Sequence, residues 1–147
     1  MRVAAMLLMI AAAAVTGPAS AGVVGGWSAT APLLRVAVSG RTYESLPLAP
    51  RDPGRAERGR MAAVRWHYRL PPGAALRAWL CAAGHCVPAS EQRGQTMAFT
   101  GLAATTPLHF RFVLTPGQQK AVVVEGMQVI VNYTEADGQD DIPVSIE

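Results

Sequence analysis

The stretch from Met61 to Leu70, MAAVRWHYRL, decides the fold class. Apolar and polar side chains alternate along it, so that one face receives Val64, Trp66, Tyr68 and Leu70 and the other Ala63, Arg65, His67 and Arg69. A period of two places one set of side chains in a core and the other in water, which predicts a half-buried β-strand. The Pro-Pro-Gly sequence at 71–73 ends this strand.

The same alternation recurs at short intervals along the chain. Residues 107–114 alternate apolar Leu108, Phe110, Phe112 and Leu114 with polar His109 and Arg111. Shorter strand signals cover 33–38, 75–81, 86–89, 96–99, 120–124 and 127–133. Many short strands separated by turn residues, without a helical pattern after the first 21 residues, predict an all-β, antiparallel β-sandwich of one domain. The even hairpin repeat of an up-and-down barrel is absent from the sequence.

The N-terminal segment, MRVAAMLLMIAAAAVTGPASA, has the organisation of a secretory signal peptide. One arginine precedes an apolar run that is too short to span a membrane, and the small residues of Ala19-Ser20-Ala21 form a cleavage site. We therefore expect cleavage between Ala21 and Gly22, and no stable membrane insertion of the mature chain. Removal of 21 of the 147 residues leaves 126, enough for one domain. The Ala-rich signal favours the bacterial periplasm.

Charge is distributed unevenly along the mature chain. Residues 22–133 carry 12 Lys and Arg against 5 Asp and Glu, whereas residues 134–147 carry 5 acidic residues and no basic one. The acidic end is predicted to be a flexible tail that either solvates the terminus or folds back on a basic face. The small net charge and the export signal argue against a nucleic-acid partner.

One long segment shows no regular pattern. Residues 47–60, PLAPRDPGRAERGR, combine arginines with proline and glycine, which predicts an unburied, mobile surface loop. The function of the wider Arg-rich region 39–60 is left open by the sequence. It is either a basic contact strip or a solvated linker.

Both cysteines lie in the stretch LCAAGHCV, residues 80–87. A redox pair, a metal site and a disulfide are the alternatives. If Ala83 and Gly84 form a two-residue turn, Cys81 and Cys86 face each other as a closely spaced cross-strand pair. The spacing differs from the C-x-x-C of redox enzymes, and two thiolates are too few for structural zinc. An oxidising compartment then favours a structural disulfide.

The sequence offers no convergent set of catalytic groups. The three histidines His67, His85 and His109 are isolated in the sequence, and no nucleophile-elbow, zinc-protease or phosphate-loop motif is present. The acidic residues after Tyr133 lack the pattern of a calcium loop. We therefore expect no catalytic residues, no cofactor and no metal.

Positive side chains on the outward faces of the expected strands are candidates for an interaction surface, and they comprise Arg65, His67, Arg69, Arg77, His109 and Arg111. If they gather, they form one positive surface for a protein partner. The alternative is that they only keep the sheets soluble. A second functional class, a carbohydrate- or peptidoglycan-binding sandwich, would use Trp27 and Trp79 as stacking platforms.

Six segments in order resemble the FlhE family of flagellar proteins, namely GGW at 25–27, WHYRL at 66–70, LCAAGHCV at 80–87, GQTMAFTG at 94–101, PLHFRFVL at 107–114 and QVIVNY at 128–133. The resemblance spans residues 25–133, within an FlhE-like domain expected over 22–133, but region 39–60 matches poorly and the chain continues past the family's usual end. It implies a non-enzymatic periplasmic β-sandwich that serves flagellar assembly and swarming. It further implies a chaperone or gatekeeper role toward rod components or the export gate, limiting premature polymerisation and proton leakage. Neither the resemblance nor the residues indicate an oligomeric state.

Overall fold

The computed structural model describes residues 25–118 and 120–135. The expected signal peptide with its cleavage site at Ala21 and Gly22, and the acidic segment beyond Glu135, lie outside the described residues. The elements are β1 (Gly25–Ala31), β2 (Leu34–Val36), β3 (Tyr43–Glu44), α1 (Pro53–Ala56), β4 (Gly59–Arg69), β5 (Leu76–Ala82), β6 (His85–Pro88), β7 (Arg93–Thr96), β8 (Leu108–Leu114) and β9 (Val122–Glu135). No helix in these residues is long and apolar enough to cross a membrane.

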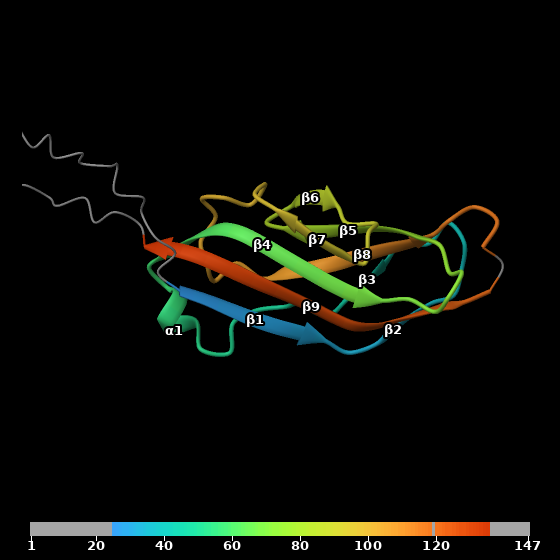
Figure 1. The fold of residues 1–147 in the computed structure, drawn as a ribbon, viewed down its shortest axis with the longest axis horizontal. Helices are drawn as coiled ribbons and strands as arrows, with labels where there is room; N and C mark the ends of the chain where they lie inside the picture. Colours follow the sequence, from blue (N-terminus) through green and yellow to red (C-terminus); the bar gives the residue numbers. More distant parts are fainter. Residues whose placement is uncertain (1–24, 119, 136–147) are drawn as a thin grey trace, which may run out of the picture.

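The strands form two antiparallel sheets (Figure 1). The first has the order β1-β9-β4-β7, with β2 also paired to β9, and the second has the order β3-β8-β5-β6. Apolar side chains from both sheets belong to one buried cluster, so the sheets pack face to face. This arrangement confirms the expected all-β, antiparallel sandwich.

Strand β4 shows the alternation that its sequence predicts. Val64, Trp66 and Tyr68 are buried, and Arg65 and Arg69 are exposed. A register shift between residues 61 and 64 places one extra residue in β4 opposite β9, which makes a β-bulge. The bulge lets residue 61 and residue 64 both face the core.

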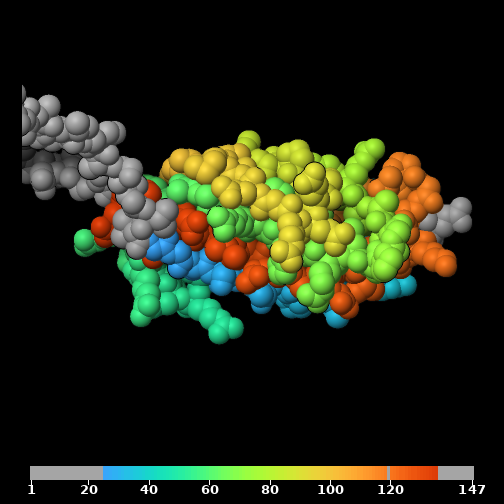
Figure 2. Space-filling view, viewed as in Figure 1, coloured from blue at the N-terminus to red at the C-terminus, as the bar shows by residue number. Residues whose placement is uncertain are grey.

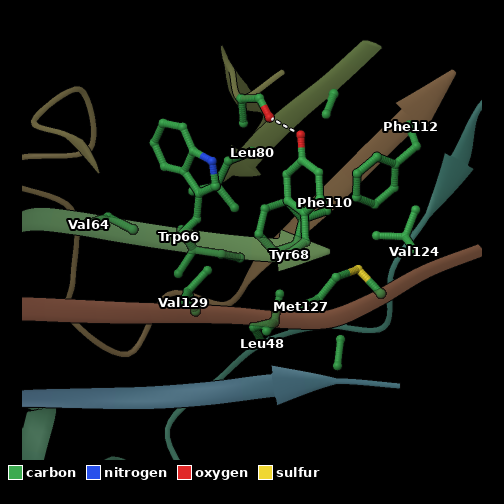
Figure 3. Packing of buried hydrophobic residues seen from close by; sticks show 14 of the residues in the cluster. Leu48, Val64, Trp66, Tyr68, Leu80, Phe110, Phe112, Val124, Met127 and Val129 are labelled. Atoms are coloured by element: carbon green, nitrogen blue, oxygen red, sulfur yellow. Dashed lines mark hydrogen bonds between the residues drawn. The ribbon is translucent and has the colours of Figure 1, made fainter. Parts of the chain in front are cut away.

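Aromatic rings from opposite sheets fill the centre of the core (Figure 3). The ring of Tyr68 on β4 meets the rings of Phe110 and Phe112 on β8 edge to face, at centroid distances of 5.7 and 5.4 Å. Its hydroxyl donates a hydrogen bond of 2.7 Å to the carbonyl of Ala89. This bond satisfies the one polar atom that the ring carries into the core.

A second small cluster closes one end of the molecule, beside α1 in Figure 1. Tyr133 packs there against Ala56 and Ala104, and its hydroxyl donates to the carbonyl of Arg55 at 3.2 Å. A Cβ added to Gly59 would lie 2.5 Å from the ring of Tyr133. The glycine therefore makes room for the tyrosine.

The cysteine hairpin has the expected register. Cys81 pairs with Cys86 across β5 and β6, and the two residues form a disulfide with a Cα separation of 4.0 Å. The turn residues Ala83 and Gly84 have φ angles of 50° and 77°, typical of a type I′ turn. His85, next to the turn, contacts the buried ring of Phe99 edge to face at 6.1 Å.

Several expected element boundaries are wrong. The strands expected at 120–124 and 127–133 are one strand, β9, because Gly126 adopts a φ of 60° within a bulge opposite β4 instead of ending the strand. The strand expected at 96–99 lies earlier, at β7. Strands β1 and β3 were not expected, because their sequences lack clear apolar alternation.

The expectation of an unburied loop over 47–60 is also wrong. Leu48 is fully buried and forms a β-bridge with Leu108, and Ala56 is buried in the second cluster. The segment includes α1 and the beginning of β4. A few small or apolar residues thus anchor a segment whose overall composition is polar.

Candidate interaction surfaces

Each sheet has an outward face that the other sheet does not cover. Paired residues of neighbouring strands point to the same side of a sheet, so the register identifies the side chains that share each face. On the first sheet, Arg65 of β4 pairs with Ile130 of β9 and with Gln95 of β7. The adjacent row places His67 between Gln128 and Arg93.

These two rows line a shallow hollow of about 360 Å³. We call it the cationic hollow; its lining residues are Arg65, Trp66, His67, Arg93, Gly94, Gln128 and Ile130. Figure 2 shows this face of the molecule, where the orange-red atoms of β9 lie between the blue of β1 and the green of β4. Arg65 Nε donates to Gln95 Oε1 at 3.2 Å, which holds the guanidinium beside a neutral partner.

Arg69 lies on the same face beyond this hollow. Its Nη2 is 4.0 Å from a carboxylate oxygen of Glu125, and both side chains are more than half exposed. An exposed pair at this distance contributes little to stability. Arg69 is thus partly neutralised, whereas Arg65 and Arg93 form no salt bridge within the described residues.

The other three predicted surface residues lie on the outward face of the second sheet. Arg77 is exposed on β5, and His109 and Arg111 are half-buried on β8. Glu44 of β3 accepts hydrogen bonds from Arg111 Nε at 3.3 Å and Nη2 at 3.0 Å, and His109 Nε2 lies 3.7 Å from the same oxygen. Glu44 therefore offsets the positive charge on this face.

The six residues do not form one positive surface, because the two sheets turn their outward faces in opposite directions. Arg65, His67 and Arg69 lie on one side, and Arg77, His109 and Arg111 on the other. Arg93 is not among the residues predicted from the sequence, because the strand expected at 96–99 in fact begins three residues earlier, at Arg93. Glu44 is not among them either, because its strand, β3, has only two residues and is too short to show an alternation of apolar and polar residues.

The tryptophans considered as stacking platforms differ in environment. Trp27 faces inward, where its Nε1 donates to the carbonyl of Ala104 at 2.8 Å. Trp79 is half-buried on the outward face of the second sheet and lines a hollow of about 340 Å³ with Thr42, Cys86, Arg111 and Val113. The two rings therefore do not form a shared platform.

A further groove follows the free edge of β1. This strand pairs with β9 on one side, and no strand of the described residues pairs with its other side. The groove has a volume of about 470 Å³ and is lined by Ser28, Ala29, Thr30, Pro47, Ala49 and Arg51. An unpaired edge beside a groove is the geometry that accepts an added strand from a partner.

Among the residues that the structure describes, Tyr68 has a shifted pKa. Burial raises the pKa of Tyr68 to about 12, but its hydroxyl is already bonded inside the core. Within residues 25–118 and 120–135, no three His, Cys, Asp or Glu side chains gather where they could share a metal ion.

Comparison with known proteins places this fold in a family. The family model described as "Flagellar protein FlhE" matches residues 34–134. The chain belongs to the FlhE family. The match begins at β2, after β1, contains both cysteines, and ends at Thr134, before most of the acidic segment.

Individual FlhE proteins agree with this assignment. The flagellar protein FlhE of Escherichia coli strain K12 is 35% identical over 113 residues, which cover 74% of this chain and 85% of the relative. A crystal structure of FlhE superposes with a TM-score of 0.66 at 34% identity, covering 76% of this chain and 97% of the other. The expected resemblance to FlhE is confirmed.

Proposed function

We propose that this protein is a non-enzymatic accessory of flagellar assembly that works in the periplasm. It would bind rod components or the export gate, and so limit premature polymerisation and proton leakage while supporting swarming. Membership of the FlhE family is the observation that carries this proposal. The family name assigns the chain to the flagellum, and the finer role remains our proposal.

Two further features support an exported location. The N-terminal 21 residues have the pattern of a signal peptide. Cys81 and Cys86 form a disulfide, a bond that persists in oxidising compartments such as the periplasm. Both features support the proposal that the chain folds after crossing the inner membrane.

The surfaces of the sandwich fit a protein partner. Rod-type subunits expose segments before they assemble, and a chaperone must cover such segments reversibly. The free edge of β1 with its groove offers backbone groups for an added strand. The cationic hollow offers a second, charged contact on the neighbouring face.

Genetic complementation tests the proposal. The gene is deleted in the flagellated host, and the deletion is complemented with the full chain or with a chain lacking residues 2–21 at matched expression. We expect the deletion to reduce swarming and to accelerate cytoplasmic acidification after an external acid shift, read with a pH-sensitive fluorescent protein. The full chain should restore both.

The shortened chain is the matched control for location. It should restore neither phenotype, because it stays in the reducing cytoplasm. Restoration by the shortened chain would overturn the periplasmic site of action. A deletion strain that swarms and holds its pH like the parent would overturn the flagellar role.

A further inference from the structure

The cationic hollow is a charged site without an acidic group of its own. Its two guanidiniums, on Arg65 and Arg93, are exposed, and no carboxylate is among its lining residues. Ile130 lies in the hollow and is 40% exposed. The hollow therefore fits a segment that combines carboxylates with aliphatic side chains.

This chain contains such a segment, at its own C-terminus. Residues 136–147 read ADGQDDIPVSIE, with four acidic residues and no lysine or arginine. Aliphatic residues occupy every second position from Ile142 to Ile146. Residues 25–135 carry 12 Lys and Arg against 6 Asp and Glu, a balance of +6, so the two parts of the chain have opposite charge.

The segment is long enough to reach the hollow. β9 ends at Glu135, and Ile130 lies five residues earlier on the same strand, a distance of roughly 17 Å at the rise of a β-strand. The 12 residues after Glu135 (147 − 135) can extend roughly 40 Å. Glu147 can therefore lie over the hollow after the chain reverses, whereas Asp140 and Asp141, five and six residues past Glu135, reach only the side of the hollow nearest to Glu135, where Arg65 pairs with Ile130.

We propose that the acidic segment 136–147 folds back and occupies the cationic hollow of the same molecule. Its carboxylates pair with Arg65 and Arg93, and an aliphatic residue covers Ile130. The segment lies beyond the FlhE family match, which ends at residue 134. Its docking is thus a property of this chain, independent of the flagellar role, and an acidic partner of the hollow would have to displace it.

Paramagnetic relaxation in the mature protein tests the docking. Ser145→Cys is labelled with a nitroxide while the Cys81–Cys86 disulfide stays oxidised. We expect loss of amide signal intensity at Arg65, His67 and Ile130, and none at Arg77 on the opposite face. About 0.5 M salt should restore the signals, because the Debye length is then only ~4 Å.

Charge variants identify the contacts that hold the segment. Asp140→Asn with Asp141→Asn and Glu147→Gln should remove the broadening, as should Arg65→Glu with Arg93→Glu. Arg77→Glu, which changes the same charge on the other sheet, is the matched control and should leave the broadening intact. Arg65, Arg77 and Arg93 are exposed, so their replacement should leave the fold intact, and unchanged core amide shifts would verify this for every variant.

Three outcomes would overturn the proposal. The first is an absence of broadening in the hollow at low salt. The second is broadening that the arginine variants leave unchanged. The third is broadening in a mixture of two chains, one that carries the nitroxide but no ¹⁵N and one that carries ¹⁵N but no nitroxide. This result would show that the segment binds a second copy instead.

Discussion

Gly59 lies against the ring of Tyr133 and leaves no space for a larger side chain. A Cβ at position 59 would lie 2.5 Å from that ring and 3.0 Å from the Cβ of Ala104. We expect Gly59→Ala to lower the free energy of unfolding by about 1–3 kcal/mol, the range for overpacking a core. Urea denaturation measures the change.

The matched control for this prediction is Gly54→Ala. An added Cβ at position 54 meets only Asp52 Oδ1, at 3.4 Å. The control should change stability by less than about 0.5 kcal/mol. Equal effects at positions 54 and 59 would show that close packing against Tyr133 is not the cause.

Tyr68 makes stability depend on pH at the alkaline end. Burial raises its pKa from 10.0 to about 12, so between these values the folded chain keeps a proton that the unfolded chain loses. The contribution of Tyr68 to the free energy of unfolding should therefore be constant below pH 10. It should fall by roughly 1–2 kcal/mol as the pH rises toward 12. Denaturation at a series of pH values tests this.

Tyr68→Phe isolates the contribution of the hydroxyl. The variant loses the bond to the carbonyl of Ala89, at a cost of about 1 kcal/mol or more at neutral pH. It should also lack the alkaline fall that the hydroxyl causes in the parent protein. A fall of the same size in both proteins would assign the effect to other groups.

The cysteine hairpin is the element whose stability is simplest to test. Cys81→Ser with Cys86→Ser removes a bond that closes a very short loop, so we expect a loss of about 2 kcal/mol by the chain-entropy estimate. Chemical denaturation of both proteins without reductant measures it. Adding reductant should destabilise the parent protein and leave the stability of the double variant unchanged. If the cysteines of the native parent react with a thiol label without reductant, the disulfide is contradicted.

Strands in which apolar and polar residues alternate strongly could be predicted from the sequence, whereas strands of small residues could not. β4 and β8 alternate large apolar with polar residues, and Ala83-Gly84 matches the turn that a two-residue hairpin needs. β1, with the sequence GGWSATA, contains mostly small residues that show no hydropathy contrast. Gly126 resembles a strand terminator in the sequence, although its positive φ forms a bulge inside β9.

At the scale of the whole molecule, the candidate surface was only partly predictable. Local alternation correctly gave the outward direction of Arg65 and Arg77, but it carries no information about which sheet each strand joins. That choice depends on long-range pairing, such as β4 with β9 and β5 with β8. The single expected surface is therefore two surfaces. Arg93 adds positive charge to the one on the first sheet, and Glu44 offsets positive charge on the other.

A binding measurement tests the central claim, that this FlhE-family chain acts on flagellar rod components, most directly. The oxidised mature protein, immobilised, is exposed to periplasmic extract of flagellated cells, to extract of the same strain lacking rod genes, and to peptidoglycan fragments. The reduced and unfolded chain serves as the control surface.

Mass spectrometry of the retained material gives the result. We expect rod components to be enriched on the folded protein over the control surface, and this enrichment to disappear with the extract lacking rod genes. Retention of glycan strands alone, or of no flagellar component, would contradict the central claim.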